Sequence, residues 1–234
     1  MKKFLFALVC ALGLSSSVFA QKLPQIPIEG MPPYKIGLTA GFNASSFSAS
    51  DFSSRAAFSF GVDFMLDASE LIPSTYLRTG LLLQMKGASF KWDEVVKHRF
   101  PTADIKPGNI DNDGYAKAFY IEIPIHYGYV YGLTDDWALL GETGPYLAIG
   151  LGGSISNPNL NTDSYKFFGQ SINYGGNQVL SSSKRFDFGW DFAISAMYMN
   201  QHQFKIGYQF GFLNVSDDFL QNRNLSVAYS YFFE

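Results

Sequence analysis

The sequence is poor in cysteine, in charged residues and in long apolar runs. Its single cysteine, Cys10, lies near the N-terminus, so the remainder of the chain has no thiol from which to form a disulfide. Charged residues make up 16% of the chain, against about 25% in a typical domain. After residue 20 no apolar run approaches the ~20 residues of a spanning helix, which excludes a helical membrane protein. The net charge of −3 and the lack of a basic patch argue against a nucleic-acid partner, and we expect none.

The N-terminus predicts export from the cytoplasm. Lys2 and Lys3 precede an apolar run from Phe4 to Leu14, and small residues then lead to Ala20. This pattern is typical of a secretory signal peptide over residues 1–20, cleaved after Ala20 during Sec-type export. A membrane anchor is the alternative, but the apolar run is too short to span a bilayer.

A lipoprotein would instead require cleavage before Cys10. Val9 is bulkier than the small residue usual at that position, and the apolar stretch before it would be very short, so the signal peptide is preferred. Residues 21–33 contain four prolines and are expected to form an extended periplasmic leader, because proline cannot donate ladder hydrogen bonds. The remaining residues, 34–234, are expected to form one domain.

Residues 119–133 show the clearest pattern in the chain. Alternate residues from Phe119 to Leu133 are apolar or aromatic, whereas the residues between them include Glu122, His126 and two glycines. Alternation with period two places these sets on opposite faces of a β-strand. The apolar face is unbroken and rich in aromatics, which suits contact with lipid better than a soluble core.

Alternation of the same kind predicts eight strands. They cover residues 34–46, 55–66, 75–92, 119–133, 137–156, 185–199, 203–215 and 225–233. Short connections alternate with longer polar ones, of which 93–117 and 157–184 are the longest. Short turns at one end and long loops at the other are typical of outer-membrane barrels. We therefore predict an all-β fold, an eight-stranded antiparallel transmembrane β-barrel.

The third expected strand is the least regular. Leu82 breaks its alternation, and Phe90 and Trp92 place large aromatic side chains on its polar face. A bulge, or the end of the membrane-embedded part near Gly87, would explain this change. A soluble barrel of lipocalin type is the structural alternative for the whole chain, and it would have its apolar residues inside.

The interior of such a barrel is narrow. Eight strands leave room only for side chains, which argues against a pore of porin size. Charges of both signs occupy inward positions, and they must pair or be solvated because an isolated buried charge is costly. The expected interior polar cluster comprises Lys35, Asp63, Arg78, Glu122, His126, Glu142, Asp191 and Lys205. We interpret it as structural, with a proton or small-ion path as the alternative.

Little in the sequence points to catalysis. His126 and Glu122 share the inner face of one strand, but they are four residues apart and too distant for contact. There is no nucleophile motif, and residues 111–114 contain only the first part of a calcium-binding loop. We therefore expect no enzyme activity, no cofactor and no metal site.

Several segments together resemble a known family. They are Tyr120–Ile125 (YIEIPI), Gly144–Gly153 (GPYLAIGLGG), Asp187–Trp190 (DFGW), Lys205–Gly211 (KIGYQFG) and Leu225–Phe233 (LSVAYSYFF). The chain resembles, over nearly all of its length after residue 20, the bacterial outer-membrane β-barrel domain family, also called porin-family or PorT-like barrels. The resemblance implies a location in the outer membrane of a Gram-negative bacterium. It implies no particular substrate.

Function is expected to reside outside the barrel wall. We expect a monomeric barrel in contact with outer-membrane lipid, acting through surface loops or a protein partner in envelope assembly, secretion support or surface binding. A porin-like transporter of small or hydrophobic solutes is the alternative. Fold resemblance alone does not transfer a role in secretion.

Overall fold

A computed structural model describes residues 33–49, 51–99, 113–156, 164–174, 177–218 and 220–233. The expected signal peptide and all but the last residue of the expected leader lie outside this part of the chain. Among the described residues, no helix has both the length and the apolar character needed to cross a bilayer. Eight long strands dominate the structure: β1 (Tyr34–Phe47), β3 (Arg55–Asp67), β4 (Thr75–Lys91), β5 (Asp113–Gly132), β6 (Trp137–Ile155), β10 (Phe186–Tyr198), β11 (His202–Asn214) and β12 (Gln221–Phe233).

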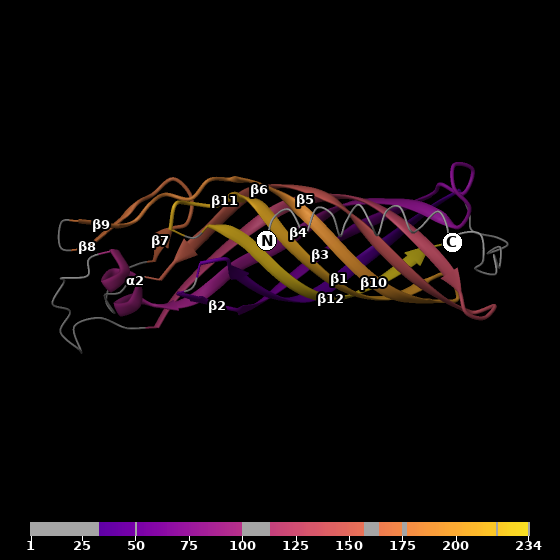
Figure 1. Cartoon of the computed structure of the whole chain (residues 1–234), viewed down its shortest axis with the longest axis horizontal. Helices are drawn as coiled ribbons and strands as arrows, with labels where there is room; N and C mark the ends of the chain where they lie inside the picture. The colour runs from indigo at the N-terminus through magenta and orange to yellow at the C-terminus, as the bar shows by residue number, and fades with distance from the viewer. Residues whose placement is uncertain are drawn as a thin grey trace, which may run out of the picture.

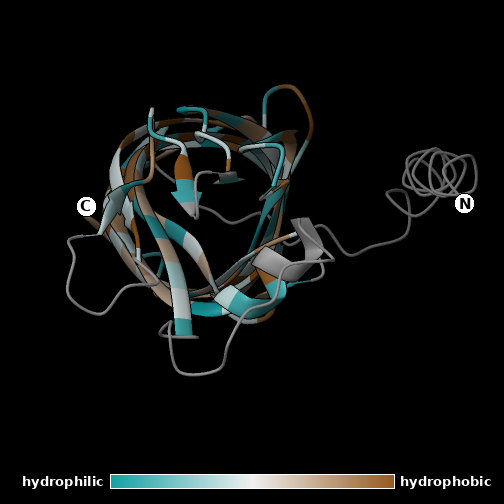
Figure 2. Cartoon of the chain, turned by 90° about the vertical axis from the view of Figure 1, so that its left-hand side faces the viewer, coloured by the Kyte–Doolittle hydropathy of each residue, from teal (hydrophilic) through white to brown (hydrophobic). Residues whose placement is uncertain are grey.

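These eight strands form a closed antiparallel ring. Each strand pairs with the next in the chain order given above, and β12 returns to pair with β1. The closing ladder runs from Ile36 opposite Phe233 to Phe47 opposite Asn222. The strands are tilted relative to the long axis of the molecule (Figure 1) and form a ring when viewed from one end (Figure 2). The predicted eight-stranded antiparallel barrel is confirmed, and closure leaves no unpaired sheet edge for lipid to meet.

The two ends of the barrel differ. At the turn end, short connections join β3 to β4, β5 to β6 and β10 to β11, and both the start of β1 and the end of β12 lie there. At the loop end lie five smaller elements, seen on the left of Figure 1: β2 (Phe52–Ser53), α2 (Trp92–Arg99), β7 (Tyr165–Lys166), β8 (Ile172–Tyr174) and β9 (Asn177–Leu180). The two longest connections, between β4 and β5 and between β6 and β10, lie at the loop end as predicted. The alternation is not complete, because the connection at residues 68–74 is as long as that at 48–54 and longer than that at 215–220.

Several expected boundaries were wrong at the loop end. β5 begins at Asp113 and β12 at Gln221, well before the expected residues 119 and 225. The extra residues have polar outward side chains, such as Lys117 and Arg223, so they lack the apolar face that marks a lipid-exposed strand. Trp92 was assigned to a strand but begins helix α2. These strands continue beyond the apolar band into a region where their outer face meets water.

The third long strand, β4, is regular on one edge only. Its pairing with β5 keeps one register from Thr75 to Lys91. On the other edge the register shifts by one residue between the β3 ladder, where Ser59 lies opposite Gln84, and the β2 ladder, where Phe52 lies opposite Phe90. The irregularity suggested near Gly87 is therefore present on that side. Leu82 and Phe90 both point to the inner face: Leu82 lines the lumen and Phe90 is buried.

The outer surface is apolar around the whole ring. Each of the eight strands contributes outward side chains that are about half exposed, namely Leu38, Phe60, Leu81, Ile123, Ile149, Phe192, Ile206 and Val227. A water-soluble barrel would bury residues of this kind. The lipocalin-type alternative, with apolar residues inside, does not fit this arrangement. Lipid is the medium that makes such a surface stable.

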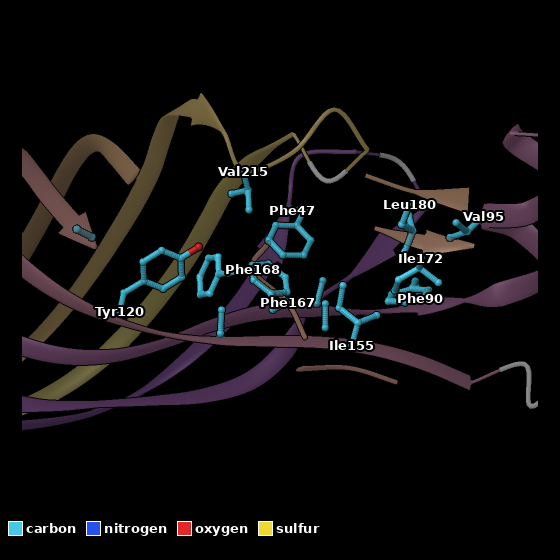
Figure 3. Packing of buried hydrophobic residues seen from close by; sticks show 14 of the residues in the cluster. Phe47, Phe90, Val95, Tyr120, Ile155, Phe167, Phe168, Ile172, Leu180 and Val215 are labelled. Atoms are coloured by element: carbon cyan, nitrogen blue, oxygen red, sulfur yellow. The ribbon is translucent and has the colours of Figure 1, made fainter. Parts of the chain in front are cut away.

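The interior is filled in three layers. Near the turn end, an apolar layer contains Met65, Tyr76, Val130, Ala138, Leu140, Met197 and Phe232. Near the loop end, a larger apolar cap includes Phe47, Phe90, Trp92, Tyr120, Ile155, Phe167, Phe168, Ile172, Leu180 and Val215 (Figure 3). Charged and amide side chains occupy the space between these two layers. The barrel therefore has a polar centre closed at both ends by apolar side chains.

Candidate functional site: the polar lumen

The eight residues expected to form the interior cluster all lie on long strands and point inward. Seven of them are buried, and the side chain of Lys205 is 14% exposed. They come from β1, β3, β4, β5, β6, β10 and β11, which places them around almost the whole ring. The structure brings six of them into one connected set of contacts, places Glu122 in a second group around Lys86, and leaves Lys35 apart. Lys35 donates a hydrogen bond of 3.0 Å to the backbone carbonyl of Asn200 at the turn end.

Arg78 is the centre of the first group of contacts. Its guanidinium group forms an ion pair with Asp63, and its Nη1 lies 3.3 Å from Oε2 of Glu142. Arg78 also donates to the side chains of Gln203, at 2.8 Å, and Ser230, at 3.3 Å. A guanidinium group can satisfy several acceptors at once because it presents five N–H donors in a plane. Arg78 thus joins β4 to four other strands.

Glu142 receives further donors from other strands. The hydroxyl of Tyr76 donates to Oε2 at 2.9 Å, and Nζ of Lys205 lies 3.4 Å from Oε1. Nδ1 of His126 lies 3.6 Å from the same Oε1. Tyr76 belongs to the apolar layer at the turn end, so its hydroxyl group connects that layer to the charged centre. A buried carboxylate needs this number of partners to offset its loss of hydration.

Lys86 is the centre of the second group of contacts, nearer the loop end. Its Nζ lies 2.9 Å from Oε2 of Glu122 and 3.0 Å from Oδ2 of Asp187. The ammonium group also lies 4.2 Å from the centre of the Tyr146 ring, close enough for a cation–π contact. The Tyr146 hydroxyl donates to Asp187 at 3.1 Å. Lys86 and Tyr146 therefore connect the polar centre to the apolar cap.

His126 and Asp191 form the third contact. Nε2 of His126 lies 3.0 Å from Oδ2 of Asp191, although β5 and β10 are separated by β6. The residue of β6 between them is Gly144, which pairs with Asp191 and lies beside His126. Because glycine has no side chain, the histidine and the carboxylate meet above it. Glu122 and His126 were expected not to touch each other, and the structure gives them different partners.

Sequence reasoning missed several polar members of the lumen. Gln203, Gln209 and Asn222 bond to Arg78, Glu122 and Asp187 respectively. Gln203 and Gln209 occupy inward positions of the expected strand 203–215, and these positions could have predicted that both side chains lie in the lumen. Asn222 precedes the expected start of its strand and carried no such signal.

The apolar cap is built partly from the long connection between β6 and β10. Phe168 packs over Gly150, where an added Cβ atom would lie 2.2 Å from the phenyl ring. Phe167 stacks on Phe47 with ring centres 6.3 Å apart. Arg185 lies over the Phe168 ring and donates to two backbone carbonyls of β6. Side chains from the loop end thus close the lumen, as Figure 3 shows.

The arrangement is better suited to holding charges than to conducting solutes. A polar cavity of about 60 Å³ lies between the described residues of the lumen. It has room for a few water molecules or one small ion, since a single water needs roughly 10–15 Å³ by this measure. Within the described residues, no group of three or more His, Cys, Asp or Glu side chains is arranged to hold a metal ion.

Solved structures that the chain is similar to include three outer-membrane barrels. Neisserial surface protein A (NspA) is 13% identical, with 88% of this chain and 100% of that chain covered and a TM-score of 0.44. Ail, the attachment invasion locus protein of Yersinia pestis, is 7% identical, with 86% and 97% covered and a TM-score of 0.39. The outer membrane enzyme PagL is 8% identical, with 83% and 98% covered and a TM-score of 0.42.

The comparison with PagL contradicts the expectation that the chain is not an enzyme. That expectation came from the lack of a nucleophile motif, but PagL is an enzyme among the barrels to which the chain is similar. A barrel of this kind therefore does not by itself exclude catalysis. At 8% identity the likeness assigns no activity to this chain either.

A family model describes the sequence more directly than any single structure. No protein with a curated description matches the chain. The model for the outer membrane protein beta-barrel domain matches residues 19–217, which is most of the chain. This match agrees with the closed ring, the apolar exterior and the polar lumen. The chain belongs to the outer membrane protein beta-barrel domain family, and the outer membrane is its location.

Proposed function

We propose that this barrel acts at its loop end, as a binding or assembly subunit of the outer membrane that contacts a protein partner or a surface ligand. The proposal rests on one observation: side chains close the lumen, while the loop end is folded into defined elements. Secretion support, envelope assembly and surface binding all need a stable membrane anchor that presents a surface. None of them needs a pore through the barrel.

The filling of the lumen supports this proposal over solute transport. Water-filled pores occur in barrels with many more strands, whereas eight strands leave an interior that side chains fill. In this barrel the polar centre is bounded by the apolar layer on one side and by the apolar cap on the other. A porin-like solute would have to displace both. A transporter would need an open pore, which would be detected as ionic current across a bilayer. The packing of the lumen opposes such a pore.

The loop end supports the proposal because buried side chains and a hydrogen bond fix its β8–β9 hairpin to the barrel. Ile172 and Leu180, one from each strand of the β8–β9 hairpin, are buried in the apolar cap. The backbone N–H of Ser181 donates to Asp218 at 2.7 Å, which ties the hairpin to the connection between β11 and β12. Asn173 and Gln178 remain exposed on the hairpin. A preorganised surface binds with a smaller entropy cost than a mobile loop.

The proposal includes the expected processing of the chain. Export through a Sec-type pathway would remove residues 1–20 and leave a leader that begins at Gln21. Intact-mass measurement of the protein from isolated outer membranes tests this step. A mature mass that starts at another residue would change the cleavage site and would leave the proposal for the loop end untouched.

The test of function is a pull-down of the tagged protein from native outer membranes in mild detergent. Partners are identified and counted by mass spectrometry. The test variant carries Asn173→Lys and Gln178→Lys on the hairpin, and the control carries Asp135→Asn and Asp136→Asn in the exposed β5–β6 turn. Both double variants raise the net charge by the same amount. We expect a protein near one-to-one stoichiometry that is lost with the hairpin variant and kept with the turn variant.

Two results would overturn the proposal. One is the recovery of the barrel without a partner, together with stepwise currents when the purified protein is placed in a planar bilayer, because these results indicate transport. The other is a partner lost only with the turn variant, since this result assigns the contact to the opposite end of the barrel.

A further inference from the structure

One row of inward side chains crosses three neighbouring strands beside the polar cavity. Asp191 on β10 pairs with Gln209 on β11, and Gln209 pairs with Asn224 on β12. Paired residues of an antiparallel sheet point to the same face, so these three side chains are adjacent in the lumen. All three line the cavity of about 60 Å³. Gln209 is 6% exposed and Asn224 is 2% exposed.

Each member of this row has an oxygen atom without a partner. Among the described residues, Oδ1 of Asp191, Oε1 of Gln209 and Oδ1 of Asn224 are buried and accept no hydrogen bond. The amide orientations follow from their neighbours: Nε2 of Gln209 donates to Glu122 at 2.8 Å, and Nδ2 of Asn224 faces the amide oxygen of Gln84 when that amide is oriented to donate to Glu122. The two unpaired atoms of these amides are therefore oxygens. Buried polar atoms are normally paired, so three buried acceptors at one cavity indicate a ligand.

The charges around the cavity favour a cation over a neutral ligand. Five buried carboxylates occupy the centre of the lumen, namely Asp63, Glu122, Glu142, Asp187 and Asp191, and three fixed cations pair with them, namely Arg78, Lys86 and Lys205. His126 lies between Glu142 and Asp191 and can carry one further positive charge. Even a charged His126 leaves one carboxylate in excess.

The excess arises where Glu122 and Asp187 share one cation, Lys86, whereas Asp63 and Glu142 together face both Arg78 and Lys205. Asp191 has His126 as its ion-pair partner, so it too lacks a fixed cation whenever that ring is neutral. An unbalanced buried negative charge is strongly unfavourable, and a cation beside Oδ1 of Asp191 and Oε1 of Gln209, whose Nε2 donates to Glu122, would offset it. One carboxylate and two amide oxygens form a hard, weakly charged ligand set. Calcium sites use more carboxylates than this, which favours a monovalent ion.

From this geometry we propose a binding site for a monovalent cation of the size of Na⁺, with Oδ1 of Asp191, Oε1 of Gln209 and Oδ1 of Asn224 as protein ligands. Water completes the coordination within the cavity. The site goes beyond the function proposed for the loop end and does not depend on it.

The first test is thermal unfolding of the purified barrel in detergent. The unfolding temperature is measured in NaCl and in choline chloride at equal ionic strength, so that screening is the same in both series. A ligand that binds the folded state raises stability with its concentration. At a tenfold excess of Na⁺ over its dissociation constant, we expect a rise of roughly 3 to 6 °C for a chain of this size.

The variants are chosen from two asparagines on one strand. Asn224→Leu removes a ligand oxygen, whereas Asn222→Leu changes the neighbouring inward position of β12, which bonds to Asp187. We expect the Na⁺ response to be lost with Asn224→Leu and kept with Asn222→Leu, whatever either change does to the absolute unfolding temperature. A response that survives Asn224→Leu would overturn the assignment.

A second test needs no variant. Crystals of the wild-type barrel grown in NaCl should show a density peak between Asp191, Gln209 and Asn224, with contacts to the three oxygen atoms that are shorter than the hydrogen bonds of a water molecule. If the peak is missing and NaCl and choline chloride give equal unfolding temperatures, the cavity holds water or a proton and the proposal is wrong.

Discussion

His126 on β5 and Asp191 on β10 are in direct contact, with 3.0 Å between Nε2 and Oδ2, across the intervening strand β6. Such a contact between strands that are not neighbours requires a gap in the inner face of the strand between them. Gly144 provides that gap. The contact shows how the chain fills a narrow lumen: long side chains on some strands meet above glycines on others.

We predict that Gly144→Ala destabilises the barrel. A Cβ atom at this position would lie 2.1 Å from the backbone oxygen of Ile125, so the strands must separate or the histidine must move. The cost is expected to be roughly 1–3 kcal/mol, as for an overpacked core. Urea-induced unfolding in detergent measures it. Gly141→Ala is the control, because nothing lies within 4 Å of the corresponding Cβ on the lipid side; equal losses for both variants would contradict the explanation.

We predict a large effect for Arg78→Leu. The substitution leaves Asp63 and Glu142 buried without their main cation, and removal of one partner of a buried ion pair typically costs about 3–5 kcal/mol. The free energy of unfolding in detergent is again the measurement. The exposed Lys91–Asp113 pair provides the comparison, and Lys91→Leu should leave the unfolding midpoint unchanged. A similar effect of the two variants would show that the lumen charges are well solvated.

We predict that the cost of a charge on the outer surface depends on depth. Ile206 lies in the apolar band on β11, and Leu213 lies near the loop end of the same strand. Ile206→Arg should cost roughly 2–4 kcal/mol and Leu213→Arg roughly 0–1 kcal/mol, because arginine near the interface reaches water. Refolding equilibria in lipid vesicles provide the values. Equal costs would mean that the apolar band extends to the end of β11.

We predict that the loop end faces the outside of the cell. Because Cys10 lies in the segment expected to be removed, a single introduced cysteine is a unique label on the mature chain. Gln178→Cys on the β8–β9 hairpin should react with a membrane-impermeant maleimide on intact cells. Asp135→Cys in the β5–β6 turn should react only after the outer membrane is permeabilised. The opposite pattern would reverse the orientation of the barrel.

The sequence predicted the membrane-embedded part of the fold well, because lipid imposes a strict alternation there. Residues such as Phe192 and Ile206 repeat at every second position, and the strands could be counted from them. Outside the band this constraint disappears, so the first residues of β5 and β12 and the short elements of the loop end were not predicted. Their stability comes from pairing and from the apolar cap, neither of which leaves a periodic signal.

The sequence predicted which residues of the candidate site point into the barrel, but not which of them touch one another. The alternation of inward and outward positions was enough to place Arg78, Glu142 and Asp191 inside. Which residues meet depends on the register of the eight ladders of the ring and on the positions of glycines, and a single sequence does not give the register. Gln203 and Gln209 were not predicted as members because they are uncharged, and Asn222 was not predicted because it precedes the expected start of its strand.

The contacts of Arg78 have a consequence for biogenesis. Asp63 lies on the neighbouring strand β3, but the other partners of Arg78 lie on β6, β11 and β12 and reach it only as the ring closes. A sheet of the first four long strands that entered lipid alone would keep the Arg78–Asp63 pair without these further partners, and it would expose the charges of its concave side to lipid. Such a fragment is penalised at every stage before closure. We therefore expect the ion network to favour the closed barrel over an open or truncated sheet in lipid.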